Sequence, residues 1–214
     1  YETLLFDQRR ELHRFAAVAL ERLAPEAIEQ IAHHAFAGAD WRRALRYQAN
    51  AGRRAQRIFA NHESAEHFRK ALRCAEELPD DETAGERLEI HRDLGQVLGS
   101  IGQYDAALDQ LRQALDLAAR SSDADASAAV CRWTGYVHEL RGDFGAAQTW
   151  IQRGLDALGA RETDATAELY AIAALISTRR GDYQQAMERC EASIRIALAA
   201  GRPATRAFAY NARA

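Results

Sequence analysis

The sequence contains little of several features that would point to particular classes of protein. Proline occurs only three times in 214 residues, aromatic residues make up 8%, and Lys70 is the single lysine. The 28 cationic residues are spread among 31 acidic ones, so no concentrated positive field favours nucleic-acid binding. No apolar run reaches the roughly 18 residues of a membrane span, and no secretory leader pattern occurs. We expect a cytoplasmic location and neither a nucleic-acid nor a membrane partner.

What is present favours helices. Hydrophobic residues make up 48% of the chain and charged residues 28%, which is the balance of a globular protein. Alanine is abundant and β-branched residues are few, so helix propensity is high. Cys74, Cys131 and Cys190 lie far apart, each within a helical pattern, and we expect them to be buried reduced thiols. No alternating pattern bounded by turns predicts a strand.

A short turn signal recurs along the second half of the chain. Each signal consists of a glycine, a polar residue and an aromatic residue in succession. A small residue lies seven positions before the glycine, and an alanine lies three positions after the aromatic residue. The turns are Gly102-Gln103-Tyr104, Gly142-Asp143-Phe144 and Gly181-Asp182-Tyr183; the small residues are Gly95, Gly135 and Ala174, and the alanines are Ala107, Ala147 and Ala186. A period of 39 to 40 residues indicates a helical array.

Each repeated position has a physical reason. Glycine adopts the left-handed conformation that ends the first helix, and the aromatic residue fills the gap between the paired helices. The small residues lie where the two helices cross, while Leu111 and Ile151 point between repeats. The sequence therefore predicts an all-α fold, a right-handed superhelix of stacked antiparallel helix pairs with about 11 helices.

An earlier stretch follows the same pattern more loosely, in two overlapping matches. The first consists of Asp40-Trp41, Ala44 and Ala51, and the second of Gly52, Ser64, Phe68 and Ala71. Because Ala51 and Gly52 would belong to two units at once, we expect one helix over about 41–60 to serve both. Asn61 is expected to cap the following helix.

These signals give a map of the whole chain. Helices are expected near 3–23, 25–37, 41–60, 62–77, 84–100, 104–120, 124–141, 144–159, 164–180, 183–200 and 203–213. They group into a linker helix over 1–24, degenerate repeat-like helices over 25–83, three repeats over 84–202 and a truncated further repeat over 203–214. Because the chain begins at Tyr1 within a helical pattern, we expect it to be a piece of a longer polypeptide whose upstream module is missing.

The repeats resemble tetratricopeptide repeats, in the longer form found in bacterial regulators, well over 84–200 and loosely over 25–80. The N-terminal third carries a narrower pattern, made of Glu11-Leu12-His13, Ile31-Ala32-His33-His34, Ala37-Gly38-Ala39-Asp40-Trp41 and Ala51-Gly52. This pattern resembles the segment after the ATPase and winged-helix modules of bacterial STAND-type regulators, including ATPases fused to nucleotide cyclases and maltose-activator-like transcription regulators. The resemblance implies that a nucleotide switch lies upstream and that the repeats sense an effector or a partner.

No convergent set of catalytic residues emerges. A phosphate-binding loop needs glycines around its lysine, and Lys70 lies in a helical pattern without them. His62 and His67 are five positions apart and so turn about 140° from each other on a helix, unlike a zinc-binding His-Glu-x-x-His. The adjacent His33 and His34 diverge, and His13 is isolated. We expect no catalytic residue, no metal ligand and no cofactor.

The first helix of each pair lines the concave surface of tetratricopeptide arrays. Projecting the repeat register gives candidate binding residues: Arg53, Arg57, Glu89, Arg92, Gln96, Arg132, Tyr136, Glu139, Glu168, Leu175, Thr178 and Arg179. Arg92 and Arg132, on adjacent first helices, could clamp a carboxylate in a bidentate manner. The alternative is that these side chains form salt bridges between repeats, with little binding value.

The leading hypothesis is a non-catalytic module of a larger cytosolic bacterial signalling or transcription regulator, which binds a protein, a peptide or a small effector. The alternative is an assembly scaffold that stacks, as a homodimer for example, through its repeat ends, because an incomplete repeat exposes apolar surface. A third hypothesis, an enzyme built on helical hairpins, has no set of acid, base or metal ligands in its favour.

Overall fold

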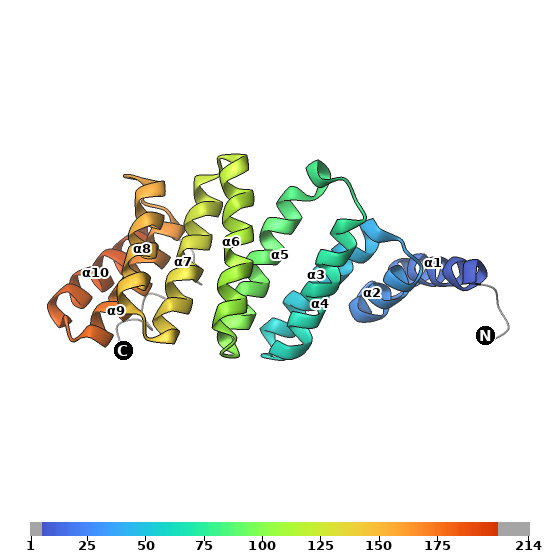
Figure 1. The fold of residues 1–214 in the computed structure, drawn as a ribbon, viewed down its shortest axis with the longest axis horizontal. Coiled ribbons are helices and arrows are strands. Elements are labelled where there is room, and N and C mark those ends of the chain that lie inside the picture. The colour runs from blue at the N-terminus through green and yellow to red at the C-terminus, as the bar shows by residue number, and fades with distance from the viewer. Residues whose placement is uncertain (1–5, 201–214) are drawn as a thin grey trace. The chain divides into compact units, whose positions relative to one another are not determined.

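The computed structural model describes residues 6–200, and this range contains ten α-helices and no strand. They are α1 (Phe6–Leu23), α2 (Ile28–Ala37), α3 (Trp41–Arg57), α4 (Asn61–Glu76), α5 (Asp80–Ser100), α6 (Tyr104–Ser121), α7 (Ala124–Arg141), α8 (Phe144–Leu158), α9 (Asp164–Arg180) and α10 (Tyr183–Ala200) (Figure 1). The all-helical prediction is confirmed. The eleventh helix, expected at 203–213, lies outside the described residues.

The helices form two compact units, Tyr1–Ile101 and Gly102–Ala214. In the first unit each of α1–α4 packs against the helix that follows it, and α3 also contacts α5. In the second unit each of α6–α9 packs against its successor, and α7 also contacts α9. One pair of helices two apart in sequence therefore lies side by side in each unit, α3 with α5 and α7 with α9, as expected for successive hairpins.

The repeated turns have the predicted backbone conformation. Gly102, Gly142 and Gly181 have φ values of 78°, 85° and 81°, in the left-handed region that favours glycine. The next helix then begins with a side-chain cap at Asp143, whose carboxylate accepts a hydrogen bond from the Ala146 N–H at 3.0 Å. One turn therefore ends a helix and starts its partner within two residues.

Small residues allow the paired helices to approach closely. A Cβ atom built on Gly135 of α7 would lie 2.8 Å from Cδ1 of Ile151 on α8. The same arrangement recurs in the degenerate unit, where a Cβ on Gly52 of α3 would lie 2.7 Å from the fully buried ring of Phe68 on α4. The Ser64 hydroxyl donates a hydrogen bond to the Gly52 carbonyl at 2.8 Å. The predicted helix crossing is confirmed in both units.

Several helix boundaries differ from those predicted. Helix α5 begins at Asp80 and not at 84, because Pro79 occupies the N-cap position and the acidic first turn suits the positive end of the helix dipole. Helix α2 begins at Ile28 and not at 25, since the Ala27 N–H bonds to the Ala24 carbonyl in a turn. Helix α3 ends at Arg57, before the left-handed Phe59, whose φ is 60°.

Two roles assigned to single residues are wrong. Asn61 is the first residue of α4 and not its cap; the N-cap is Ala60, which makes no side-chain capping bond. Tyr183 does not fill a gap between helices, because 68% of its surface is exposed. Its equivalent Phe144 packs against the buried cluster formed by α7, α8 and α9, whereas α10 packs mainly on α9.

Substitution Gly52→Ala should lower the free energy of unfolding by about 1–3 kcal/mol, because the new methyl group overpacks the buried Phe68 ring. Gly85→Ala is the matched control in α5, since its Cβ would meet nothing within 4 Å. A gain of about 0.5–1 kcal/mol is expected there from helix propensity. Urea denaturation measures both; a Gly52→Ala variant as stable as Gly85→Ala would contradict the close crossing.

Candidate ligand-binding face

The candidate binding residues lie on neighbouring first helices within each unit. The first unit holds Arg53 and Arg57 on α3 and Glu89, Arg92 and Gln96 on α5. The second unit holds Arg132, Tyr136 and Glu139 on α7 and Glu168, Leu175, Thr178 and Arg179 on α9. Because α3 contacts α5 and α7 contacts α9, each subset comes from two neighbouring helices of its own unit.

In the first unit, α3 and α5 carry opposite charges. Helix α3 has no acidic residue and bears Arg42, Arg43, Arg46, Arg53, Arg54 and Arg57. Helix α5 has two arginines, Arg87 and Arg92, and six acids: Asp80, Asp81, Glu82, Glu86, Glu89 and Asp93. Arg42 pairs with Glu82 at 2.7 Å and with Glu86 at 3.3 Å. Arg53 pairs with Glu89 at 2.7 Å and with Asp93 at 3.0 Å.

A groove with a volume of about 340 Å³ lies between these two helices. Buried Leu45, Ala49 and Ile90 provide its apolar surface. Its polar lining consists of Asp40, Arg42, Arg43, Arg46, Asn50, Arg53, Glu86 and Glu89. The long arginine–carboxylate pairs hold the two helices apart and leave a polar cleft between them. Apolar side chains at these positions would pack more tightly and fill the space.

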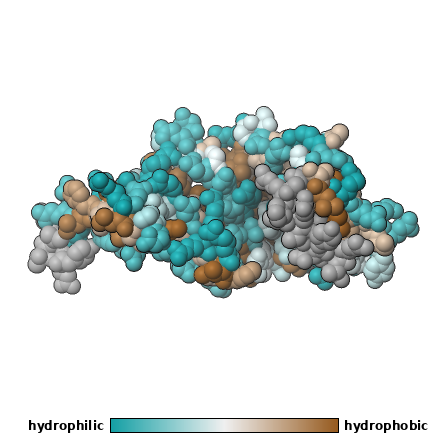
Figure 2. All heavy atoms as spheres, turned by 180° about the vertical axis from the view of Figure 1, so that it is seen from behind, coloured by the Kyte–Doolittle hydropathy of each residue, from teal (hydrophilic) through white to brown (hydrophobic). Residues whose placement is uncertain are grey.

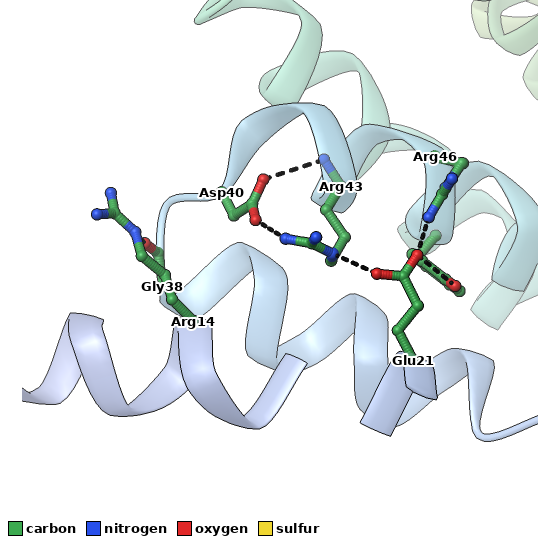
Figure 3. Close-up of polar contacts among 7 residues, drawn as sticks. Arg14, Glu21, Gly38, Asp40, Arg43 and Arg46 are labelled. Carbon is green, nitrogen blue, oxygen red and sulfur yellow. Dashed lines mark hydrogen bonds and ion pairs between the residues drawn. The ribbon is translucent and has the colours of Figure 1, made fainter. Parts of the chain in front are cut away.

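The cationic wall of this groove is fixed by a carboxylate from α1 (Figure 3). Glu21 accepts hydrogen bonds from Arg43 Nε at 2.8 Å, from the Tyr47 hydroxyl at 3.0 Å and from Arg46. Arg43 also pairs with the N-cap residue Asp40. The hydrogen bond from Arg43 lowers the pKa of Glu21 against the opposing effect of burial. Glu21 is therefore ionised at neutral pH and orients two guanidinium groups.

In the second unit, two ion pairs join α7 to α9. Arg132 Nε lies 3.1 Å from Glu168 Oε2, and Arg179 Nε lies 3.1 Å from Glu139 Oε1. Burial raises the pKa of Glu139, although Arg179 acts in the opposite direction. The side chain of Glu139 is 3% exposed, and its Oε2 has no hydrogen-bond partner among the described residues. Arg179 is therefore the main charge partner of a buried carboxylate.

Aromatic side chains lie beside one of these pairs. The Arg132 guanidinium lies 4.3 Å from the centre of the Trp133 ring, a cation–π distance. Trp133 and Tyr136 meet edge to face at 5.8 Å. Burial raises the pKa of Tyr136, so its hydroxyl stays protonated. This part of α7 combines a cation with two half-buried rings.

The remaining candidates make local contacts. Arg92 pairs with its neighbour Asp93 at 2.8 Å, and Arg57 is exposed at the last residue of α3. Gln96 and Leu175 are half-buried, and the Thr178 hydroxyl donates to the Ala174 carbonyl at 3.0 Å. Arg92 and Arg132 belong to different units, and each is engaged within its own unit, so their joint clamp stays a prediction.

The second unit has a hollow of its own, of about 500 Å³, between α8, α9 and α10. Tyr170 and Arg189 contribute to its lining, together with Ile151 and Ile176. Arg189 donates hydrogen bonds to the Ser177 hydroxyl at 2.7 Å and to the Ala173 carbonyl at 3.1 Å. No residue of the candidate set lines this hollow, because the α9 residues that line it, Tyr170, Ala173 and Ile176, are not the positions that the repeat register selected on that helix.

The sequence projection missed residues that the structure places in the groove or around it. Arg42, Arg46 and Asn50 line it, and Glu21 orients its arginines from α1. A signal for part of this was present: Arg42 and Glu82, like Arg53 and Asp93, are 40 residues apart, one repeat length. The contribution of Glu21 depends on how α1 packs against α2 and α3. Because α1 precedes the repeats, Glu21 has no equivalent position in the repeat pattern.

The surroundings of two thiols and two histidines do not favour catalysis. Burial raises the pKa of the Cys74 thiol to about 12 and that of Cys131 to about 11, so both thiols are protonated at neutral pH. His62 is exposed, while His67 Nδ1 lies 2.7 Å from the Gln48 side-chain oxygen.

Within residues 6–200, each helix is too short or too polar to cross a lipid bilayer.

Comparison with known proteins identifies the class of fold. Residues 60–120 match the tetratricopeptide repeat family. No curated protein matches this sequence. The stacked hairpins and the family match together confirm the predicted tetratricopeptide-like fold class.

Three solved structures illustrate the likeness. BtubC (BKLC) from P. vanneervenii has a TM-score of 0.62 at 16% identity, over 92% of this chain and 92% of that one. A Rap protein complexed with Competence and Sporulation Factor gives 0.65 at 14% identity, over 98% of this chain and 65% of that one. Tetratricopeptide-like repeats of a putative kinesin light chain from Podosopora anserina give 0.66 at 18% identity, over 89% and 93%. At these identities the likeness concerns the fold.

Substitution Arg179→Ala should destabilise the protein by about 1–3 kcal/mol at pH 7, because it leaves the Glu139 carboxylate charged and buried without its partner. Since burial raises the folded-state pKa of Glu139, this penalty is present at neutral pH and disappears as the pH falls below the ordinary glutamate value. Urea denaturation at about pH 7 and about pH 4 measures the difference. Arg112→Ala, which removes an exposed pair with Asp109, is the control and should change stability by less than about 0.5 kcal/mol at either pH. An equal loss for Arg179→Ala at both pH values would contradict the assignment.

Proposed function

We propose that this chain is a non-catalytic binding module that holds an extended, acidic segment of a protein partner in the groove between α3 and α5. The observation that carries the proposal is the groove itself, with its arginine wall on α3 and its apolar surface from Leu45, Ala49 and Ile90. A tetratricopeptide-like fold supports a role in protein interaction, and a Rap protein of similar fold has been solved in complex with Competence and Sporulation Factor.

The spacing of polar groups along α3 suits an extended chain. Arg46, Asn50 and Arg53 are four and three positions apart, so they follow one face of the helix. An asparagine side chain offers both a donor and an acceptor, the pair that a peptide backbone requires. The arginines on either side present planar donors to carboxylates. The groove can therefore contact backbone and acidic side chains of one segment at once.

The accessible charge favours an acidic partner over a basic one. Arg46 has 59% of its side chain exposed and Arg42 has 45%, although both already have carboxylate partners within the protein. Exposed ion pairs of this kind contribute little to stability, so exchanging one carboxylate for another costs little. Two of the three acids that line the groove, Glu86 and Glu89, lie on α5. The third, Asp40, caps α3 and pairs with Arg43, so the wall formed by the residues of α3 itself is cationic.

The resemblance of the N-terminal third to STAND-type regulators supports a wider proposal. In that arrangement the module belongs to a larger cytoplasmic regulator, and occupation of the groove by a partner or a small effector reports to a switch elsewhere in the polypeptide. Only a difference in affinity between two arrangements of the repeats could drive such a signal. The open reading frame around this sequence tests the wider proposal: an upstream phosphate-binding loop would support it, and its absence would contradict it.

Peptides selected from a random display library on this protein should be enriched in Asp and Glu. The variant Arg42→Ala/Arg46→Ala should bind a selected peptide roughly 10-fold more weakly, equivalent to about 1.4 kcal/mol, in fluorescence anisotropy. The control Arg54→Ala/Arg69→Ala removes the same charge from exposed positions that do not line the groove. Selected peptides without acidic residues, or an equal loss in the control, would rule out the α3–α5 groove as the binding site.

An apolar face on α1 favours a second function, assembly with another copy of the chain. Figure 2 shows hydrophobic surface over the N-terminal helix, at the left of that view. Leu12, Phe15 and Val18 follow one face of α1 at intervals of three and are 51%, 71% and 38% exposed. Exposed apolar clusters of this kind are typical of contact surfaces.

Sedimentation velocity tests this assembly. The weight-average mass of the wild type should rise with protein concentration, and Phe15→Glu should hold the protein at the monomer mass, because a charge in an apolar interface is costly. Ile58→Glu, at another exposed apolar position, should behave like the wild type. A wild-type protein that stays monomeric up to high micromolar concentrations would exclude assembly through α1.

A further inference from the structure

Three histidines converge where α1 packs against α2. His13 comes from α1, and His33 and His34 come from α2. The Nδ1 atoms of His13 and His34 are 2.8 Å apart. The ring centre of His33 lies 5.8 Å from that of His13 and 5.2 Å from that of His34. One ring nitrogen from each histidine lies within 4.8 Å of the other two.

This convergence is a product of the hairpin. Neighbouring residues on a helix point about 100° apart, so His33 and His34 alone would not approach one target. His13 lies near both rings, with its centre 5.0 Å from that of His34. The approach of the two helices is held by Arg14, which donates to the Gly38 carbonyl at 2.7 Å (Figure 3). Gly38 has no room for a side chain, since its Cβ would lie 2.9 Å from the Arg14 backbone nitrogen.

We propose that His13, His33 and His34 form a binding site for a divalent transition-metal ion of the zinc class. A tetrahedral Zn²⁺ ion lies about 2.0–2.1 Å from imidazole nitrogens, which places those nitrogens about 3.3 Å apart. The observed separations, from 2.8 Å between the two Nδ1 atoms to at most 4.8 Å, bracket that value. Side-chain rotations alone bring the three nitrogens to a common ion, and water completes the coordination.

The ligand type selects the class of ion. Imidazole nitrogen suits Zn²⁺, Cu²⁺, Ni²⁺ and Co²⁺, whereas Mg²⁺ and Ca²⁺ prefer oxygen ligands. A metal ion binds the lone pair of an unprotonated imidazole nitrogen.

A hydrogen-bonded pair explains only part of the arrangement. The contact between His13 and His34 is satisfied by one N–H donor and one lone pair. It does not account for His33, which is exposed and yet has its ring edge to face with both other rings. A shared ion gives all three rings one role.

Metal binding here would strengthen a weakly packed helix. In α1 the buried residue is Ala17, whereas the larger apolar side chains of the helix, Leu12, Phe15 and Val18, are exposed. A bond from His13 to an ion held by α2 would cross-link the first hairpin. The α1 residue Glu21 orients the arginines of the α3–α5 groove, so the ion would also fix one wall of that groove through α1.

Titration of the metal-free wild-type protein with Co²⁺ tests the site. We expect visible absorption bands of a low-symmetry Co²⁺ complex that saturate at one equivalent, displacement of Co²⁺ by Zn²⁺, and a higher melting temperature with Zn²⁺. The thiols do not provide an alternative site, because Cys74, Cys131 and Cys190 are each buried and lie on three different helices.

Variants then identify the ligands. His34→Ala should weaken Zn²⁺ binding by at least roughly 100-fold, since changes even outside the ligand shell cost about 10–100-fold. Because His34 is half-buried, His33→Ala is the second variant; its side chain is exposed, and its loss removes a ligand without disturbing packing. His62→Ala, which removes an exposed histidine of α4, is the matched control and should bind Zn²⁺ as the wild type does. No saturable binding of Co²⁺ or Zn²⁺ by the wild type, or unchanged affinity in folded His33→Ala and His34→Ala, would overturn the proposal.

Discussion

Contact between the two helices of a hairpin is the constraint on which the other features depend. At Gly52 and at Gly135 a helix passes so close to its partner that even a methyl group would overlap Phe68 or Ile151. Such contact buries apolar side chains at the density of a protein interior, although each hairpin contains only about 35 residues. Within each unit, neighbouring first helices also meet, α3 with α5 and α7 with α9, and the charged candidate residues lie on these four helices.

The contact between neighbouring first helices differs between the first unit, where it joins α3 and α5, and the second, where it joins α7 and α9. Between α7 and α9, Glu139 is buried and meets one arginine, so the ion pair belongs to a packed interface. Between α3 and α5, three of the four ion pairs have both side chains at least 35% exposed, and a groove of about 340 Å³ remains. A packed interface suits a structural connection, and a groove lined by exchangeable ion pairs suits a ligand. This difference is why the binding proposal concerns the first unit and not the second.

Much of the fold could be predicted from the sequence, because its determinants are local or periodic. The left-handed glycines of the turns and the small residues of the helix crossings recur at fixed intervals, so each supports the others. Some helix starts were predicted with an error, such as that of α5 at Asp80. An acidic run after a proline is equally typical of a loop and of the first turn of a helix. The candidate site was predicted in outline only. Pairs one repeat apart, such as Arg53 with Asp93, follow the period. The histidine cluster does not, because it requires the closure of a hairpin, α1 with α2, that has no counterpart elsewhere in the repeat pattern.

The charge difference between α3 and α5 also bears on how such an array can change during evolution. The crossing of Gly52 with Phe68 and that of Gly135 with Ile151 both bring a glycine of the first helix against a large side chain of the second. The charges do not recur in this way. Helix α3 carries arginines without acids, whereas α7 and α9 each present both signs to the other. A hairpin inserted between α3 and α5 would separate every one of their ion pairs. The ion pairs between α3 and α5 therefore exist only in the present order of the hairpins.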